Sequence, residues 1–314
     1  MKYLITGGAG FIGSFLAESL LADGHQVTVL DNLRTGRNKT KGAIFIRGDI
    51  RDFDTVLKAV RDADQVFHLA AAVGVRHCLE QPDYAFETNV LGSHNVLKAC
   101  LTFNRPMLFT SSSSVYGKIE KSNVGEDDDV KYGSPAKLAW AYSYHKAMKE
   151  SLAIWHGQKG YPIKIVRLFN CIGQRQVGSY GMVVPRFVKF SKAGEPLVVY
   201  GDGTQTRTFG DVRDIVWGIR LVMDQGLSGE PYNLGGEDEV SINELAVLIK
   251  KTVKSKSPVI HLPFDKAFGA SFEETLRRRP NLAKIRKLGY EPRYNLQQTI
   301  NWIAQDAELK KRKA

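Results

Sequence analysis

Short apolar runs alternate with amphipathic segments along the first half of the chain. Runs rich in Val, Ile, Leu and Phe predict buried strands, and stretches with apolar residues three or four positions apart predict helices. The predicted strands cover residues 1–6, 25–32, 43–50, 65–71, 106–114 and 161–170. The predicted helices cover residues 11–24, 52–63, 89–103 and 136–159. Because strands alternate with helices, we expect an α/β fold with a doubly wound parallel sheet covered on both faces.

Beyond residue 170 the alternation is less regular and predicts a smaller α/β lobe. Further helices are predicted at about 185–194, 211–226 and 242–254, and further strands at 197–200 and 231–236. Ser241, with Glu244 three residues later, forms a capping-box pattern at the start of the last of these helices. We expect a Rossmann domain over residues 1–169 with a return segment at about 208–233. Residues 170–207 and 234–314 are expected to form a substrate-binding lobe.

The composition is that of an ordinary soluble protein, with 43% hydrophobic and 25% charged residues. The chain has no apolar run of transmembrane length and begins directly with a strand-like stretch, so we expect neither a membrane partner nor a signal peptide. Its cysteines, Cys78, Cys100 and Cys171, are widely spaced and form no CxxC pair. This spacing predicts neither a disulfide framework nor a metal site, and it favours a reducing cytoplasm.

The formal net charge of +11 raises the question of an anionic partner. Part of the excess lies in the terminal KKRKA, and the basic residues are not interleaved with aromatic residues in any stripe. We therefore do not expect nucleic-acid binding. A solvated surface, with a few arginines for an anionic substrate, accounts for the charge.

The segment LITGGAGFIGS reads as a strand, a glycine-rich turn and the start of a helix. Gly7, Gly10 and Gly13 permit a tight turn and a close approach of the backbone to a pyrophosphate at the helix N-terminus. Asp31 ends the next predicted strand, 18 residues beyond Gly13. A carboxylate there suits the ribose hydroxyls of NAD and repels the 2′-phosphate of NADP. Arg34 and Arg37 nevertheless leave NADP as an alternative cofactor.

The candidate chemistry lies in two later segments, SSSSVYG at the end of a predicted strand and WAYSYHK in a predicted helix. A serine at the carboxyl end of a parallel strand faces the ligand crevice. Tyr142 and Lys146 are four residues apart and share one helix face, while Tyr144 lies on another face and His145 is expected to pack. A lysine ammonium one turn away, together with a positive nicotinamide ring, would favour the phenolate and make Tyr142 a base.

TGGAGFIG, Asp31, SSSSVYG and the Tyr142–Lys146 pair together resemble the extended short-chain dehydrogenase/reductase family, specifically its NAD-dependent nucleotide-sugar epimerases, dehydratases and decarboxylases. The resemblance extends through HLAAAVGV, NVLGSHNVL, RLFNCIGQRQ, YGMVVPRF, GEPLVVYGDGTQTRTFGDVRD and YNLGG. It implies that Tyr142 is the base, that Lys146 holds the nicotinamide ribose and lowers the pKa of Tyr142, and that Ser112 binds the sugar O4. It also implies a UDP-sugar substrate and a homodimer formed through a helix bundle.

The same resemblance assigns binding residues. The implied NAD-binding residues, besides Tyr142 and Lys146, are Gly7, Gly10, Phe11, Ile12, Gly13, Asp31, Asn32, Arg34, Asp49, Ile50, Leu69, Ala70 and Ala71. The implied substrate-binding residues are Arg76, Ser113, Asn170, Val184, Tyr200, Arg207 and Arg278. Two guanidiniums such as Arg207 and Arg278 also suit a diphosphate on chemical grounds. Arg76 would contact a phosphate or, in a uronate, the carboxylate.

The shared reaction of this family is oxidation at sugar C4, and the branch that follows decides the product. The resemblance places an acid–base pair or an acid at positions 113 and 114 in dehydratases and decarboxylases, whereas this chain has Ser113 and Ser114. We therefore expect a 4-epimerase acting on a UDP-hexose or UDP-uronic acid. A UDP-glucuronate decarboxylase or a 4,6-dehydratase of the same family is the alternative.

Several residues depart from the family pattern without removing a catalytic group. These are His145, Gln174 and Asn281, and they leave the identity of the sugar open. A non-catalytic NAD-binding regulator is the alternative of another class. The presence of Ser112, Tyr142 and Lys146 argues against it, because a regulator needs none of them.

Overall fold

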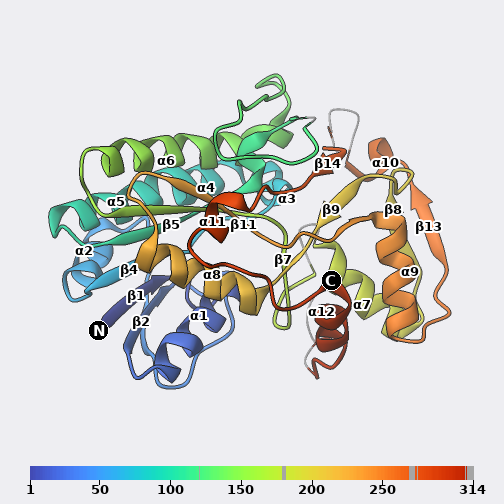
Figure 1. Ribbon diagram of the computed structural model, residues 1–314, viewed down its shortest axis with the longest axis horizontal. Helices are drawn as coiled ribbons and strands as arrows, with labels where there is room; N and C mark the ends of the chain where they lie inside the picture. The colour runs from blue at the N-terminus through green and yellow to red at the C-terminus, as the bar shows by residue number, and fades with distance from the viewer. Residues whose placement is uncertain (120, 179–181, 269–272, 274, 308, 310–314) are drawn as a thin grey trace.

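The computed structural model describes residues 1–119, 121–178, 182–268, 273, 275–307 and 309, without the side chains of residues 75–77 (Figure 1). Its centre is a seven-stranded sheet with the strand order β11-β6-β5-β4-β1-β2-β3. Every pairing in this sheet is parallel. The strands are β1 (Lys2–Thr6), β2 (Gln26–Asp31), β3 (Ile44–Arg47), β4 (Gln65–His68), β5 (Met107–Ser112), β6 (Ile163–Leu168) and β11 (Pro231–Leu234). The predicted doubly wound α/β fold is confirmed.

Helices cover both faces of the sheet. The helices α1 (Phe11–Ala22) and α8 (Val212–Gln225) lie on one face, and α2 (Phe53–Arg61), α5 (Ser93–Thr102) and α6 (Ala141–Gln158) lie on the other (Figure 1). The side chains of a strand alternate between the two faces. Accordingly, Ile5 belongs to the core beneath α1 and α8, and its neighbour Leu4 belongs to the core beneath α2, α5 and α6.

The segments around the helix that carries Tyr142 and Lys146 are more broken than the sequence predicted. Two short helices, α3 (Val75–Glu80) and α4 (Pro82–Phe86), precede a π-helical turn, η1 (Glu87–Gly92), which runs directly into α5. The helix expected over 136–159 begins as a 3-10 turn, η3 (Leu138–Trp140), before α6. The strand expected over 106–114 ends at Ser112, whose hydroxyl accepts a hydrogen bond from the Ser114 N–H and caps a 3-10 turn, η2 (Ser113–Tyr116).

A second core lies at the other end of the molecule, among α7 (Val183–Ala193), α9 (Ile242–Thr252) and α12 (Leu296–Ala304). The capping box expected for α9 is confirmed, because the Ser241 hydroxyl accepts from the Glu244 N–H at 3.1 Å and the Glu244 carboxylate accepts from the Ser241 N–H at 2.8 Å. The small strands and helices of this end are β7 (Cys171–Ile172), β8 (Leu197–Tyr200), β9 (Thr206–Thr208), β10 (Gly210–Asp211), β12 (Glu239–Ser241), β13 (Val259–Leu262), β14 (Arg277–Arg278), α10 (Phe264–Phe268) and α11 (Ala283–Arg286).

The last third of the chain contributes to both cores. Leu282, Ile285 and Tyr290, in and around α11, pack with α1 and α8 beneath the sheet, whereas Leu296 and Ile300 pack with α7 and α9. The expected return segment also joins the sheet, because β11 pairs with β6. The division of the chain at residues 170, 208 and 234 stays a prediction.

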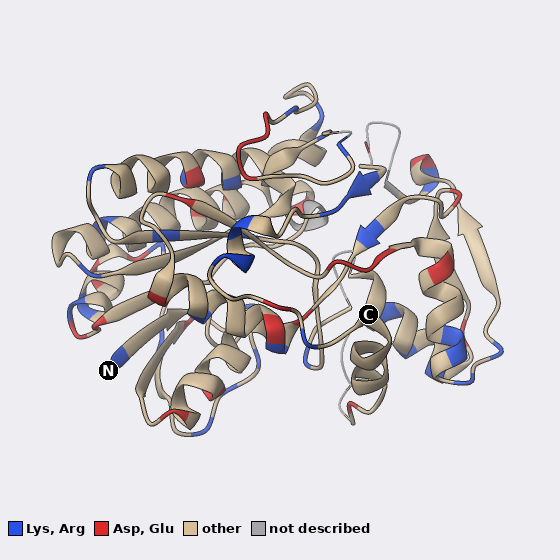
Figure 2. Cartoon of the chain, viewed as in Figure 1, with Lys and Arg blue, Asp and Glu red and all other residues tan. Residues whose placement is uncertain are grey.

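Positions of Lys and Arg are interspersed with positions of Asp and Glu along the chain (Figure 2). The cysteines Cys78, Cys100 and Cys171 are free thiols. Within the described residues, no helix combines the length and the apolar character needed to cross a bilayer.

Candidate active site

The glycine-rich turn after β1 is shaped by close backbone contacts. The Gly7 N–H donates to the Leu30 carbonyl at 2.9 Å, and the Gly10 N–H donates to the Gly7 carbonyl at 3.0 Å. Gly7 has a φ of 74°, and a Cβ atom on it would lie 2.7 Å from the Ala70 nitrogen. A Cβ atom on Gly13 would lie 2.4 Å from the Gly7 carbonyl oxygen. These positions therefore require glycine.

The first turn of α1 can bind an anion. Gly10 is the N-cap residue of α1, and among the described residues no side chain caps this end of the helix. The first turn, which contains Phe11 and Ile12, carries no acidic residue. The free N–H groups and the positive end of the helix dipole then point toward the turn. This arrangement fits the pyrophosphate of a dinucleotide.

Asp31 is buried at the end of β2. Its carboxylate accepts from the Ala9 N–H at 3.0 Å and the Leu33 N–H at 2.8 Å. Burial raises the pKa of Asp31, and these two backbone hydrogen bonds oppose the rise. Arg34 lies against the Tyr84 ring, 3.9 Å from its centroid, and donates to Gln81, so its contacts are with the segment of α4.

Asn32 and Asp49 lie together beside this strand end. Asn32 donates to the Asp49 carboxylate at 2.9 Å. Burial would raise the pKa of Asp49, but hydrogen bonds from Arg51 and Asn32 bring it below its ordinary value. The Ile50 side chain is in the core and its carbonyl accepts from Asn95 at 3.1 Å. Residues 31–34 and 49–50 are thus brought together as expected, and their contacts with NAD stay a prediction.

The residues after β4 lie next to the glycine turn. The Leu69 N–H donates to the Thr6 carbonyl at 3.0 Å, and the Ala70 N–H donates to the Thr6 hydroxyl at 3.4 Å. Ala71 follows in the same half-buried segment. The three residues therefore border the turn, and their contacts with NAD stay a prediction.

Ser112, Tyr142 and Lys146 come together where β5 meets α6. The Ser112 side chain lies next to the Tyr142 hydroxyl and lowers its pKa. The Lys146 ammonium donates to the Thr110 carbonyl at 2.8 Å and lies 5.9 Å from the centroid of the Tyr142 ring. Tyr142 and Lys146 are 9% and 3% exposed. The predicted trio is therefore one contiguous, largely buried group.

Burial dominates the electrostatics of the trio. It raises the pKa of Tyr142 above the ordinary phenol value, Cys78 adds to the rise, and the hydrogen bond with Ser112 opposes it. Burial also lowers the pKa of Lys146 to about 8. Lys146 is not among the groups that shift the pKa of Tyr142 here, so the expectation that it lowers this pKa stays a prediction.

The neighbours of Tyr142 on its helix behave as predicted. The Tyr144 hydroxyl donates to the Gly133 carbonyl at 2.8 Å and its ring packs edge-on against Tyr132. The His145 ring packs edge-on against Phe86 of α4. Cys78 was missed from the sequence, although it packs beside Tyr142 in a small buried cluster. Nothing in the local pattern around Cys78 indicated that α3 lies against α6.

Arg207 and Arg278 are partners across neighbouring strands. β14 pairs with β9 in parallel, and Arg278 is in register with Arg207. Residues in register project to the same side of a sheet, so the two arginines share one face. This pairing of residues far apart in sequence suits a diphosphate, and the substrate contact stays a prediction.

The other predicted substrate residues have mixed surroundings. Asn170 donates to the Thr208 carbonyl at 2.8 Å, and the Tyr200 hydroxyl accepts from Arg186 at 2.7 Å. Ser113 is buried beside Ser112. Val184 is 1% exposed and packs in the second core, so only its backbone is left for a ligand. The side chain of Arg76 lies outside the described part of the structure.

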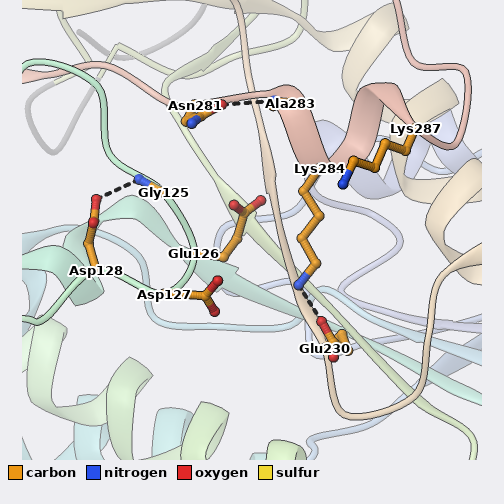
Figure 3. Close-up of a pocket in the computed structure, with 9 residues that line it drawn as sticks. All are labelled: Gly125, Glu126, Asp127, Asp128, Glu230, Asn281, Ala283, Lys284 and Lys287. Carbon is orange, nitrogen blue, oxygen red and sulfur yellow. Dashed lines mark hydrogen bonds and ion pairs between the residues drawn. The ribbon is translucent and has the colours of Figure 1, made fainter.

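A cavity of about 420 Å³ lies between residues 125–128 and the segment around α11 (Figure 3). It is lined by residues 125–128, Glu230 and α11, and Lys284 forms an ion pair with Glu230 at 2.5 Å. Its lining includes none of the predicted site residues. Four carboxylates and two lysines line it, and we assign no ligand to it.

Comparison with known proteins agrees with this geometry. The model of the NAD dependent epimerase/dehydratase family matches residues 3–235. A UDP-N-acetyl-alpha-D-glucosaminuronate decarboxylase of Bacillus cytotoxicus is 40% identical over 313 residues, covering 96% of this chain and 97% of that protein. The UDP-glucuronic acid decarboxylase 1 of Danio rerio is 35% identical over 304 residues, covering 96% of this chain and 71% of that protein.

A solved structure adds the cofactor to this comparison. The UDP-glucose 4-epimerase of Thermus thermophilus, in complex with NAD, superposes with a TM-score of 0.86 at 30% identity, covering 97% of this chain and 98% of that chain. The glycine turn, Asp31 and the uncapped start of α1 fit the same cofactor. With the buried trio beside that turn, the chain is a nucleotide-cofactor enzyme of the NAD dependent epimerase/dehydratase family.

Proposed function

We propose that the protein is an NAD-dependent decarboxylase of a UDP-hexuronate, acting through a 4-keto intermediate. The observation that carries the oxidation step is the buried Ser112–Tyr142–Lys146 group beside the dinucleotide turn. The similarity to two named decarboxylases over nearly the whole chain favours loss of CO2 over the epimerisation expected from the sequence. The acetamido and the plain glucuronate are both candidate sugars.

The proposed oxidation uses the trio in distinct roles. Ser112 holds the sugar O4, and Tyr142 accepts its proton as the C4–H bond breaks. Bound NAD supplies the hydride acceptor and the positive ring charge that helps to offset burial of the phenolate. Lys146 orients the cofactor ribose and keeps a positive charge behind Tyr142.

The serines at positions 113 and 114 do not argue against decarboxylation. A ketone at C4 is β to the C6 carboxylate, because C5 lies between them. When the C5–C6 bond breaks, CO2 leaves and the electron pair of that bond passes through C5 to O4 as an enolate. The hydroxyls of Ser112 and Tyr142 can donate to that oxygen. No protein carboxylate is needed for this step, so the earlier inference from Ser113 and Ser114 gave too much weight to elimination chemistry.

The remaining steps close the balance of the reaction. C5 takes up a proton, the hydride returns to C4, and O4 regains its proton. The reaction therefore consumes one proton for each CO2 released and regenerates NAD. An epimerase, in contrast, consumes no proton.

A UDP-sugar 4-epimerase is the second candidate. It is favoured by the similarity to the epimerase of Thermus thermophilus, and Ser113 and Ser114 are compatible with it as they are with decarboxylation. A 4,6-dehydratase lacks its usual acid–base pair at these positions, and a non-catalytic NAD-binding regulator would not need the trio.

Product analysis separates these candidates. The protein, with NAD, is incubated separately with UDP-glucuronate, UDP-N-acetylglucosaminuronate, UDP-glucose and UDP-N-acetylglucosamine, and each mixture is followed by proton NMR and mass spectrometry. We expect a uronate to lose CO2 and give the corresponding UDP-pentose. A product of unchanged mass with an inverted C4 coupling pattern would instead identify an epimerase.

If a uronate is the substrate, Arg76→Ala is expected to weaken its binding, and unchanged affinity would exclude the contact between Arg76 and the carboxylate.

We also infer a homodimer and a reducing cytoplasmic location. The dimer proposal is supported by apolar side chains on the outer side of α4, η1 and α6, where Phe86, Leu91, Met148 and Trp155 are 43%, 49%, 57% and 53% exposed. Their contiguity is supported by the packing of Phe86 against His145 and by the spacing of Met148 and Trp155 along one helix face. The location rests on the free cysteines.

A further inference from the structure

A chain of buried polar groups runs from the glycine turn to the catalytic helix. The Thr6 hydroxyl is hydrogen-bonded to His68 Nδ1 at 2.6 Å, and His68 Nε2 is hydrogen-bonded to the Ser93 hydroxyl at 2.7 Å. The amine of Lys149 donates to the same Ser93 hydroxyl. Thr6, His68, Ser93 and Lys149 are 0%, 1%, 3% and 7% exposed. We call these four residues the buried chain.

Lys149 has no counterion in the part of the chain that the structure describes. The carboxylate of the next residue, Glu150, pairs with Arg167 at 2.7 Å. The amines of Lys149 and Lys146 lie 4.8 and 5.4 Å from the centroid of one ring, that of Phe109. Two lysines of one helix are therefore buried close together.

The surroundings disfavour a second positive charge at this place. Burial, and then the charge of Lys146, lower the pKa of Lys149 well below that of a free lysine. Burial, and then both lysines, lower the pKa of His68. Three elements that pack around Lys149 contribute only uncharged side chains: β1 contributes Thr6, β5 contributes Phe109 and Thr110, and α5 contributes Ser93. The carboxylate of Glu150 on α6 and the thiol of Cys78 on α3 raise the pKa of Lys146, and neither shifts the pKa of Lys149.

We propose that Lys149 is a positioning residue, whose uncharged amine ties the catalytic helix through Ser93 and His68 to the dinucleotide turn and leaves Lys146 as the charged member of the pair. The buried chain joins four elements, β1, β4, α5 and α6. Its far end, Thr6, precedes Gly7 and accepts the Ala70 N–H beside the turn. Lys149 thereby sets the place of Tyr142 and Lys146 relative to the bound cofactor.

The charge state of Lys149 is tested by the pH dependence of unfolding. A lysine titrates near 10.4 in the unfolded chain. If Lys149 is neutral in the folded protein, the unfolded chain binds one more proton between its two pKa values, so stability rises with pH there. The unfolding constant of the wild type should then fall about tenfold more per pH unit than that of Lys149→Met.

The range between about pH 7 and 8 suits this measurement, because His68 titrates near 6.5 when unfolded and Lys146 near 8 when folded. Lys251→Met, an exposed lysine of α9, is the matched control and should keep the slope of the wild type. If Lys149→Met does not fold, Lys149→Gln preserves a donor to Ser93 without a titrating amine. Equal slopes for the wild type and the Lys149 variant would overturn the proposal.

The positioning role is tested by a double-mutant cycle with Ser93→Ala. We expect Lys149→Met to weaken NAD binding and to lower kcat several-fold, and Ser93→Ala to add little in the double variant, because both cut the same chain. Fully additive losses would show that Lys149 does not act through Ser93. Only the kcat readout rests on the proposed function. NAD affinity, measured by calorimetry, and the unfolding slopes remain valid if the protein decarboxylates no sugar.

Discussion

Three side chains carry the proposed chemistry, and two of them owe their properties to burial. The Ser112 side chain lies next to the Tyr142 hydroxyl, and the Lys146 ammonium donates to the Thr110 carbonyl. Burial moves both the phenol and the ammonium toward their neutral forms, because each loses the hydration of its charged form. In the proposed mechanism the positive nicotinamide ring of bound NAD would favour the phenolate and help to offset this burial.

Substitution of Tyr142 by phenylalanine tests the base directly. We expect Tyr142→Phe to lower kcat by about 10²- to 10⁴-fold, the usual contribution of a general base. NAD binding should persist, because the ring still fills its place. Steady-state kinetics and calorimetry with NAD measure the two effects.

Tyr144→Phe is the matched control for this substitution. It removes a hydroxyl from the same helix, but that hydroxyl donates to the Gly133 carbonyl on another face. Stability should fall by about 1 kcal/mol with little change in kcat. An equal loss of kcat in both variants would point to disruption of α6 rather than to loss of the base.

The charge of Lys146 predicts an alkaline limit to activity. Its pKa of about 8 means that the ammonium is present below that pH and is lost as the pH rises through it. We expect kcat/KM to fall above about pH 8, because the phenolate and the cofactor ribose lose their positive neighbour. Profiles between about pH 6 and 10 measure this, and Lys146→Arg, which stays charged, should move the decline upward. A flat wild-type profile across the range would contradict the assignment.

At the scale of elements, the contact between the glycine turn and α1 positions the cofactor. Gly13 lies in α1 against the turn, where a Cβ atom would lie 2.4 Å from one backbone oxygen and 2.7 Å from the Gly8 Cα. Backbone atoms cannot move aside as a flexible side chain can. The approach of helix to turn therefore depends on this glycine.

Gly13→Ala is expected to destabilise the protein by about 1–3 kcal/mol and to weaken NAD binding at the same time. Thermal unfolding and NAD calorimetry measure the two effects. Gly24→Asn is the control, because a Cβ atom there meets nothing within 4 Å and asparagine tolerates a positive φ. Tight NAD binding by Gly13→Ala would show that the turn can widen without loss of its anion site.

At the scale of the whole molecule, the exposed apolar face over α4, η1 and α6 predicts self-association. We expect Met148→Glu combined with Trp155→Glu to convert a dimer to a monomer, because two charges would be buried at the interface without partners. Light scattering coupled to size exclusion measures the mass. Val247→Glu is the control, since Val247 is 64% exposed on α9 in the other part of the molecule.

A wild-type protein that is monomeric at assay concentrations would contradict the predicted dimer. If the double variant remains dimeric, the pairing surface lies elsewhere on the molecule. Either result leaves the trio unaffected, because Tyr142 and Lys146 point to the interior of the same helix layer.

Local patterns predicted the sheet and the cofactor turn well. The strand–turn–helix run through Gly7, Gly10 and Gly13 is local in sequence, and so is the four-residue spacing of Tyr142 and Lys146. The sequence favoured epimerisation because Ser113 and Ser114 cannot act as the acid and base of an elimination, whereas the similarity to decarboxylases favours loss of CO2. The small strands β9, β12 and β14 were missed, since two or three residues give no periodic pattern.

The sequence by itself determined the parallel sheet and the glycine turn, because each depends on spacing along one or two neighbouring elements, and its resemblance to a family named the candidate trio. Only the tertiary structure decided the register of Arg278 with Arg207 and the surroundings of Lys149. Both depend on segments distant along the chain, which set burial and the distance between charges. Nothing in the sequence singled out Lys149, because its burial depends on β1, β4 and α5, which pack around it and remove the water that would hydrate its charge.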